Sequence, residues 1–195
     1  MLEVVRAREA QVMPWRNGGG VTREYFRAGG DDFDWRLSMA QIDVSGPFSS
    51  FPMVDRILVL LSGAVDLRID GFNVSLAQPL ELVRFAGEAD VDATVVAAPS
   101  TDLNLMWQRD RFEVIVEVRH VAVGDVLATG GVGVGFVALG ECSFDDGDLE
   151  PGDAWSFTEA CTVLAGDATV VLFELSPSSA VGRSESTRLN SSHGY

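Results

Sequence analysis

The chain has 195 residues, 47% of them hydrophobic, which is enough for one large or two small domains with a substantial core. Its net charge of -15 and isoelectric point near 4.3 disfavour binding to a nucleic-acid backbone, which would repel so acidic a surface. No run of 18 apolar residues occurs, and the N-terminus lacks the basic and apolar regions of a signal peptide. We therefore expect a cytoplasmic protein without a transmembrane helix.

Short alternating or β-prone runs follow one another along the chain, separated by turns rich in glycine, proline or acidic residues. In the first half they cover residues 2–7, 21–27, 35–41, 55–61, 65–70, 72–76, 80–85, 91–97 and 103–108. In the second half they cover residues 112–118, 121–128, 132–139, 154–157, 161–164 and 169–175. No amphipathic helix of convincing length occurs, and a spacing of about ten residues is typical of sandwiches and barrels.

The number of strands exceeds what one small sandwich needs, so the sequence predicts an all-β protein of two tandem barrels. We expect an N-terminal barrel over residues 1–115 and a smaller C-terminal barrel over residues 116–177. Residues 178–195 are polar and without periodicity, which indicates a disordered or non-native tail.

The segment from Pro14 to Glu24 combines three consecutive glycines with an aromatic ring, two arginines, an amide and a hydroxyl group. We interpret it as one wall of a polar binding site, with these candidate ligand-binding residues: Trp15, Arg16, Asn17, Gly18, Gly19, Gly20, Thr22 and Arg23. The glycines either line the site with backbone N–H groups or permit a tight crossing that only glycine fits. Trp15 is either a core or lid residue or a ring that stacks on the ligand. No Gly-Lys-Ser/Thr motif follows, so a nucleotide-binding loop is excluded.

Arg36 and Ser38 share one face of the predicted strand 35–41, and the opposite face carries large apolar side chains. If this polar face lines a barrel, Arg36 must be paired or must meet an anionic ligand, because a lone buried charge is too costly. Arg36, Ser38 and Arg56 therefore complete the candidate ligand-binding set. The alternative for each arginine is a surface position or an ion pair with a nearby acidic residue.

The basic residues support an anionic ligand, because all 14 are arginine and arginine suits bidentate recognition of carboxylate or phosphate. Codon usage in a GC-rich genome also explains the absence of lysine. Residues 1–60 hold seven arginines against eight acidic residues, whereas residues 61–195 hold seven against twenty-one. An anionic ligand would therefore prefer the N-terminal part.

The histidine and cysteine content of the sequence gives little support for a metal site or for nucleophilic catalysis. Only His120 and His193 are present, and His193 lies in the tail, so a histidine-rich metal centre is excluded. The two cysteines fit no metal motif and have no flanking histidine, so we expect small buried residues. Glu24 or Asp55 could act as a general base, but an adjacent arginine would lower the carboxyl pKa and weaken it in that role. We expect no cofactor, no metal and no catalytic residues.

Five stretches resemble the HutD/Ves family: residues 14–24, 33–40, 46–52, 55–60 and 102–106. Their order and spacing resemble the family along roughly residues 1–175. The resemblance implies a bicupin, meaning two cupin-type β-barrels in one chain, and a link to histidine utilisation or stress. It implies no established catalytic activity, and the suggested role is to bind a pathway intermediate such as formylglutamate. Arg16 stands where the family usually has lysine, and Met53 where it usually has glycine.

We therefore favour a non-catalytic or regulatory protein that binds a small anionic metabolite. The first alternative is a metal-independent cupin enzyme, an isomerase or hydrolase that acts on a related carboxylate. The second is a protein-interaction module. The expected partner is a small anionic molecule, with no nucleic acid and no membrane, and a homodimer is left open.

Overall fold

The computed structural model describes residues 2–15, 18–30 and 32–178, and every regular element in these ranges is a β-strand. The predicted all-β class is therefore confirmed. Within the described ranges there is also no helix that is long and apolar enough to cross a membrane. The strands fall into two compact units, and each is described by itself below.

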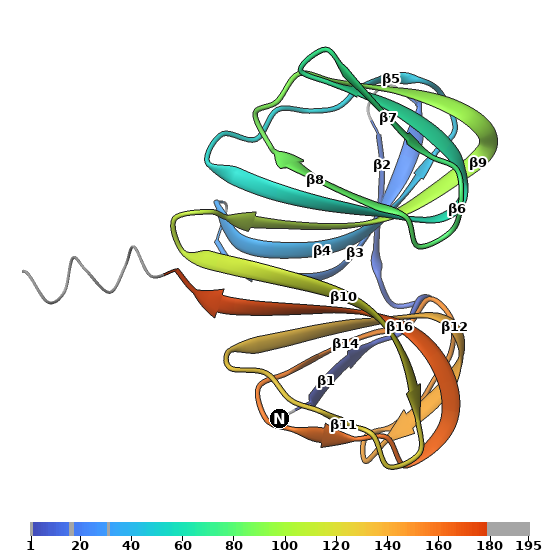
Figure 1. Cartoon of the computed structure of the whole chain (residues 1–195), viewed down its shortest axis with the longest axis vertical. Coiled ribbons are helices and arrows are strands. Elements are labelled where there is room, and N and C mark those ends of the chain that lie inside the picture. The colour runs from blue at the N-terminus through green and yellow to red at the C-terminus, as the bar shows by residue number, and fades with distance from the viewer. Residues whose placement is uncertain (1, 16–17, 31, 179–195) are drawn as a thin grey trace, which may run out of the picture. The chain divides into compact units, whose positions relative to one another are not determined.

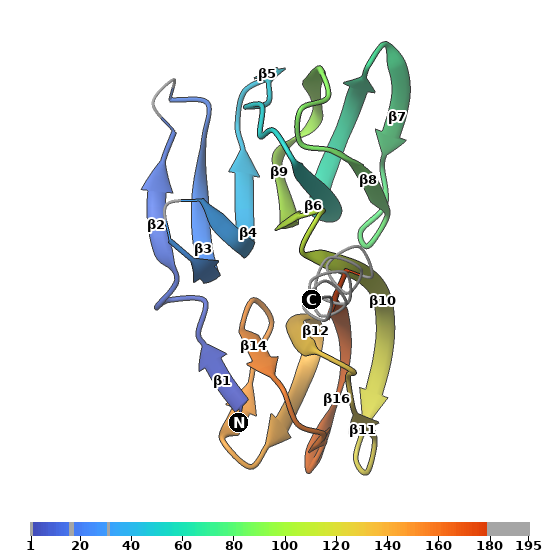
Figure 2. The same cartoon turned by 90° about the vertical axis from the view of Figure 1, so that its left-hand side faces the viewer.

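The N-terminal unit comprises residues 5–108 and 152–154 and is built on one eight-stranded sheet, with its strands coloured blue to green in Figure 1. Its strands are β2 (Gln11–Pro14), β3 (Gly20–Gly29), β4 (Phe33–Ile42), β5 (Gly46–Pro47), β6 (Val54–Ile69), β7 (Phe72–Leu76), β8 (Leu82–Ala86) and β9 (Val91–Gln108). The hydrogen-bonded order is β2-β3-β4-β9-β6-β7, with β5 on β9 and β8 on β6. Figure 2 shows β2, β3 and β4 side by side.

The C-terminal unit comprises residues 2–4, 109–151 and 155–178 of the described chain. Its strands are β1 (Leu2–Val5), β10 (Phe112–Ala122), β11 (Val126–Leu127), β12 (Val132–Phe144), β13 (Gly147–Leu149), β14 (Ala154–Phe157), β15 (Cys161–Thr162) and β16 (Ala165–Pro177). Most form a six-stranded sheet of order β1-β14-β12-β16-β10, with β13 on β12, while β11 pairs with β15.

The observed units differ from the predicted domain boundaries at two places. The predicted boundary between residues 115 and 116 falls inside β10, and the compact units meet at Gln108 and Arg109 instead. The first residues of the chain also belong to the C-terminal unit, because β1 pairs with β14. Sequence reasoning assigns an N-terminal strand to the domain that follows it, so this pairing across the chain could not be anticipated.

Two pairs of predicted strands are each a single long strand. The predicted runs 55–61 and 65–70 merge into β6, and the runs 91–97 and 103–108 merge into β9. The β6–β9 pairing continues past Ser62 and Gly63 through register shifts, and Gly63 has a φ of 79°. A glycine in the left-handed region is typical of a β-bulge, which bends a strand without ending it. The break at Ser62 and Gly63, between the two predicted runs, is therefore a bulge and not a turn.

The interior of the N-terminal unit is partly filled by an apolar cluster. Its buried members are Leu58, Leu60, Val65, Leu67, Leu76, Phe85, Val91 and Ala93. Leu58 and Leu60 lie on the same face of β6 as Arg56, because residues two apart on a strand point to the same side. Ile57 and Val59, on the opposite face, are buried as well. A strand buried on both faces has a continuous apolar sequence, as residues 57–60 do.

The C-terminal unit packs around Trp155, which is fully buried, with its ring 5.3 Å from that of Phe144. The same cluster contains Leu149, Phe157 and Val170. The cavity beside Phe157 in this unit has a volume of only about 80 Å³. This unit is therefore filled by its own side chains, and the larger cavity lies in the N-terminal unit.

We expect Gly63→Ala to destabilise the protein by about 2 kcal/mol, because an added Cβ would require a left-handed backbone. That Cβ would also lie 2.6 Å from the carbonyl oxygens of Ala97 and Pro99. Urea unfolding of both proteins measures the difference in free energy. Gly46→Ala is the control, since a Cβ there meets nothing within 4 Å. Equal stability of the two variants would contradict the role given to the bulge.

Candidate functional site

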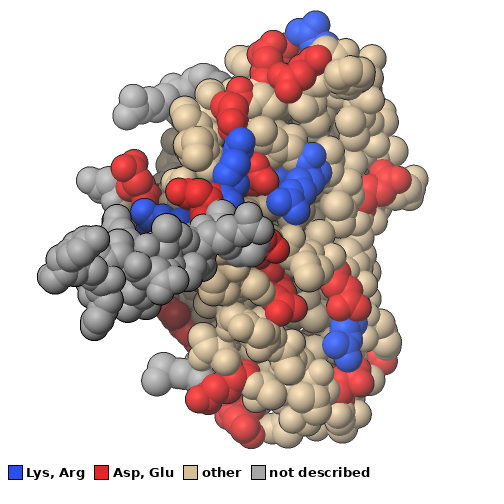
Figure 3. All heavy atoms as spheres, turned by 60° about the vertical axis from the view of Figure 1, so that its left-hand side comes forward, with Lys and Arg blue, Asp and Glu red and all other residues tan. Residues whose placement is uncertain are grey.

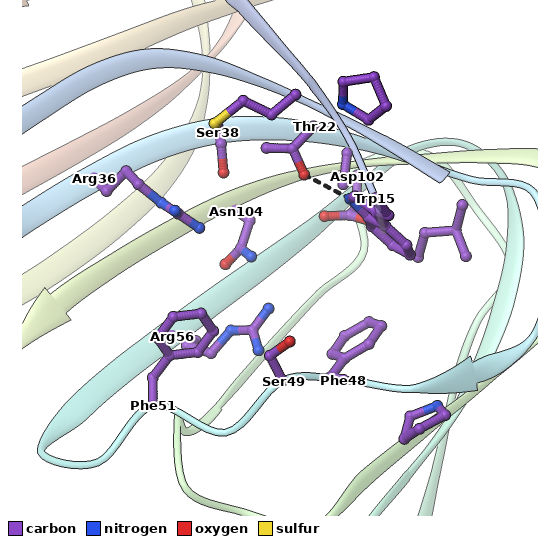
Figure 4. A pocket seen from close by; sticks show the side chains of 15 residues that line it. Trp15, Thr22, Arg36, Ser38, Phe48, Ser49, Phe51, Arg56, Asp102 and Asn104 are labelled. Atoms are coloured by element: carbon purple, nitrogen blue, oxygen red, sulfur yellow. Dashed lines mark hydrogen bonds between the residues drawn. The ribbon is translucent and has the colours of Figure 1, made fainter. Parts of the chain in front are cut away.

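The N-terminal unit contains a cavity of about 740 Å³, which is within the usual range for small-molecule sites (Figure 4). The strands contribute most of its wall, and the segments after β2 and after β5 contribute the rest. The lining residues are Met13, Pro14, Trp15, Thr22, Arg36, Ser38, Ala40, Ile42, Pro47, Phe48, Ser49, Phe51, Arg56, Asp102 and Asn104.

The register of β4, β9 and β6 arranges the polar side chains of this cavity in rows. One row joins Arg36, Met106 and Arg56; the next joins Ser38, Asn104 and Leu58; the third joins Ala40, Asp102 and Leu60. Cross-strand partners lie on the same face of a sheet, and rows two residues apart are about 7 Å apart. The two arginines are therefore at one end of the polar strip, and Asp102 is at the other.

Arg56 is the least compensated charge in the cavity. Its side chain is 6% exposed, and among the described residues it has no ion pair and its Nε has no hydrogen-bond partner. Burial lowers its pKa to about 10, with Asp102 acting in the opposite direction. Its guanidinium carbon lies 5.1 Å from the ring centroids of Phe48 and Phe85 and 5.9 Å from that of Phe51. These rings stabilise a cation electrostatically without using its N–H donors.

Arg36 is better compensated than Arg56. Its Nη1 lies 3.6 Å from Oε2 of Glu24, and its Nη2 donates to Sδ of Met106 at 3.4 Å. Burial lowers the pKa of Arg36, and the Glu24 carboxylate opposes that shift. Its Nε still has no partner in the described part of the chain. A buried arginine here must be paired or must meet an anion, and Glu24 supplies the pairing for Arg36.

Asp102 and Asn104 are polar side chains with unused acceptors. Asp102 is 2% exposed and Asn104 is 6% exposed, and within the described residues neither Oδ2 of Asp102 nor Oδ1 of Asn104 accepts a hydrogen bond. Burial raises the pKa of Asp102 to about 7, and the positive charge of Arg56 acts against this rise. A carboxyl group with such a pKa exchanges its proton near neutral pH.

The glycine segment shapes the edge of the cavity through Trp15. The indole Nε1 of Trp15 donates to Oγ1 of Thr22 at 2.8 Å, which fixes the ring against β3 (Figure 4). A Cβ on Gly20 would lie 3.1 Å from this ring and 2.3 Å from the carbonyl oxygen of Gln41. Gly18, with a φ of 69°, donates its N–H to the carbonyl oxygen of Trp15 at 3.0 Å. Of the two alternatives for the glycines, Gly20 fits the tight crossing.

The structure brings only part of the predicted set to the cavity. Trp15, Thr22, Arg36, Ser38 and Arg56 line it, whereas Gly18, Gly19, Gly20 and Arg23 are not among the lining residues. Arg16 and Asn17 lie outside the described residues. Arg23 lies near Tyr25 instead: burial raises the pKa of Tyr25 to about 12, and the charge of Arg23 partly offsets that effect. Ligand binding by the lining residues stays a prediction.

Sequence reasoning missed Asp102 and did not decide on Asn104. The signal was present, because Asp102, Asn104 and Met106 alternate with Leu103 and Leu105 as a half-polar strand does. The loop after β5 carries two aromatic residues, Phe48 and Phe51, which line the cavity beside Arg56.

Two exposed arginines of the N-terminal unit, Arg68 and Arg84, differ from Arg56 in having carboxylate partners. Arg68 lies 2.6 Å from Asp92, and Arg84 lies 3.1 Å from Asp55. On the face shown in Figure 3, arginines lie beside acidic side chains. Across the described ranges, no three His, Cys, Asp or Glu side chains gather in a way that could hold a metal ion.

The family model of HutD matches residues 7–181. The chain belongs to the HutD family. The predicted resemblance to the HutD/Ves family is thereby confirmed.

Two relatives of this HutD-family chain are named as protein Ves and as a protein from the hutC region. Protein Ves of Citrobacter koseri is 37% identical over 139 residues, or 67% of this chain and 71% of that protein. An uncharacterised 21.2 kDa protein from the hutC 3′ region of Pseudomonas putida is 37% identical over 115 residues, or 57% of this chain and 60% of that protein. The chain therefore spans less than two thirds of the latter relative. The second name links the family to a histidine-utilisation locus.

Solved structures agree with this assignment. HutD from Pseudomonas fluorescens has a TM-score of 0.78 at 28% identity, over 91% of this chain and all of that one. Two more distant structures support the fold alone: a bacterial pirin from Escherichia coli, with a TM-score of 0.67 at 13% identity, and a cupin 2 barrel protein from Leptotrichia buccalis, with a TM-score of 0.57 at 8% identity. The fold is therefore cupin-like.

We expect Asp102→Asn to be more stable than the wild type above pH 7 by roughly 1 to 4 kcal/mol. Burial raises the pKa of Asp102 from 3.8 to about 7, so the folded protein holds this proton more tightly than the unfolded chain. Wild-type stability from this group is therefore lost as pH rises from about 4 to about 7. The difference in the free energy of unfolding between variant and wild type should therefore decrease as pH falls through that range.

Urea unfolding at pH 5, 6, 7 and 8 measures this gap. Asp110→Asn, at an exposed position, is the control for removing one negative charge. A gap that widens as pH falls would contradict the assigned direction of the Asp102 pKa.

Proposed function

We propose that the N-terminal unit binds a small carboxylate metabolite, with Arg56 as the group that holds the carboxylate. The observation that carries this proposal is a buried guanidinium that lines a cavity and has no ion-pair partner among the described residues. A buried charge without a counterion is costly, and a bound carboxylate would supply two acceptors in the geometry that arginine prefers. Arg36 would contribute a second positive charge.

A histidine-degradation intermediate such as formylglutamate is the ligand class that the family link supports best. The link to histidine degradation comes from the name of a relative. The carboxylates and the amide of formylglutamate suit a cavity lined by cationic and neutral polar side chains. The proposed role is that of a regulatory or sensing protein, because the strongest feature of the site is an unpaired cation for binding.

We expect the 195-residue chain to bind N-formylglutamate, and Arg56→Gln to weaken this binding by about 10- to 100-fold. Isothermal titration calorimetry measures both affinities, with glutamate and glutarate as further carboxylates. Arg68→Gln is the matched control, because it removes an arginine from the same strand, β6, at an exposed ion pair. Equal losses in the two variants would contradict the role of Arg56. Failure of every carboxylate to bind would contradict the proposed function.

We expect Arg56→Met to be at least as stable as the wild type without ligand, although it should not bind carboxylates. Methionine fills a similar volume among Phe48, Phe51 and Phe85 and removes a desolvated charge. Thermal unfolding in ligand-free buffer measures this. A loss of more than about 2 kcal/mol would indicate that Arg56 serves the fold rather than a ligand.

A metal-independent enzyme acting on a related carboxylate is the second candidate, and Asp102 is the observation that favours it. A buried carboxyl group with a pKa of about 7 beside a cavity suits general acid–base chemistry at neutral pH. Glu24 fits this role less well, because it pairs with Arg36 and Arg27. Mass spectrometry of the same carboxylates after incubation would detect a product, and its loss in Asp102→Asn would favour this candidate.

A further inference from the structure

The polar atoms without partners in the cavity are of two opposite kinds. Among the described residues, Nε of Arg36 and Nε of Arg56 are donors without acceptors. Oδ2 of Asp102 and Oδ1 of Asn104 are acceptors without donors. All four side chains line the same cavity (Figure 4). A ligand that satisfies only the arginines would leave the two acceptors unsatisfied, at a cost in binding free energy.

Charged side chains lie around Asp102, but among the described residues none donates a hydrogen bond to its Oδ2. Two cationic side chains line the cavity with Asp102, Arg56 on β6 and Arg36 on β4. Glu24 on β3 pairs with Arg36 and also with Arg27. In the described part of the chain, none of them forms an ion pair or hydrogen bond with Asp102, whose side chain is 2% exposed. Its row partners, Ala40 and Leu60, are apolar.

We propose that Asp102, as a carboxylate, accepts a hydrogen bond from an N–H group of the ligand while Arg56 holds the ligand's carboxylate. The site thereby selects carboxylates that also carry an N–H donor, as amido acids do, over plain carboxylates of the same size. This inference rests on the proposed binding function and adds the chemistry of the second ligand group.

The arrangement of the rows allows one small ligand to meet both groups. Asp102 lies two rows from the Arg36–Arg56 row, so the backbones are separated by about 13 Å along the strand. The long Arg56 side chain shortens this gap, since it lines the same cavity as Asp102. Asn104 occupies the row between them and offers a second acceptor for the same N–H group.

The protonation of Asp102 makes this inference testable through the number of protons that the protein takes up when a ligand binds. Its pKa of about 7 means that both protonation states are populated near neutral pH. A plain carboxylate on Arg56 neutralises the charge that favours ionised Asp102, so its binding should draw a proton onto the protein. An N–H donor at Asp102 favours the ionised form and opposes that uptake.

The test compares N-acetylglutamate with 2-acetoxyglutarate, an ester that has oxygen in place of the N–H group. Calorimetry at pH 7 in phosphate and in Tris gives the affinity and the number of protons exchanged. We expect the amide to bind at least about tenfold more tightly, because it alone donates to a charged acceptor. We also expect it to take up fewer protons than the ester, by up to about half a proton per site.

Asp102→Asn should remove the proton difference and most of the affinity difference, whereas the exposed control Asp110→Asn should keep both. A thermal melt verifies that each variant is folded. Equal affinity of amide and ester in the wild type overturns the inference, and so does a preference that survives in Asp102→Asn.

The remaining outcomes separate this inference from the proposed function. If neither probe binds but glutarate does, the N–H requirement is wrong and carboxylate binding stands. If no carboxylate binds at all, the proposed function fails and the inference fails with it.

Discussion

The burial of Arg56 without a carboxylate partner is the constraint on which the candidate site depends. Three phenylalanine rings surround its guanidinium and stabilise the charge, yet they accept none of its hydrogen bonds in the usual geometry. The leucines that follow Arg56 on the same strand face belong to the buried apolar cluster of this unit. A charge interacts more strongly in such surroundings than in water, and this is the physical basis of the proposed anion binding.

Arg36 shows why charge alone does not identify the binding group. Both arginines lie in one row across β4, β9 and β6. Of these two, only Arg36 forms an ion pair with Glu24 on β3. The pairing leaves Arg36 as a second positive charge whose position is fixed by Glu24 and Met106. Arg56 lies on an interior strand of the sheet, and its guanidinium is enclosed by three phenylalanine rings. A side chain that is already buried loses less conformational entropy when a ligand binds, which supports the proposed role.

Strand alternation predicted much of the fold and part of the site. It placed Arg36 and Ser38 on the polar face of β4, and the cavity is lined by that face. The same alternation around Asp102 resembles a core strand, because Leu103, Leu105 and Met106 lie beside the two polar residues. The bulge at Gly63 could not be predicted locally, since a turn and a bulge both require glycine with positive φ. The cross-chain pairing of β1 depends on long-range packing, which local patterns do not report.

The loop after β5 shows how a departure from local preference serves the site. Met53 has a φ of 64°, in the left-handed region where the related proteins are expected to have glycine. A side chain there costs about 1 kcal/mol, so the surrounding contacts must enforce the turn. Phe51, two residues earlier, donates its N–H to the carbonyl oxygen of Gly87 at 2.8 Å and places its ring beside Arg56. The strained turn therefore lies where the chain must bring Phe51 back to the arginine before β6 begins.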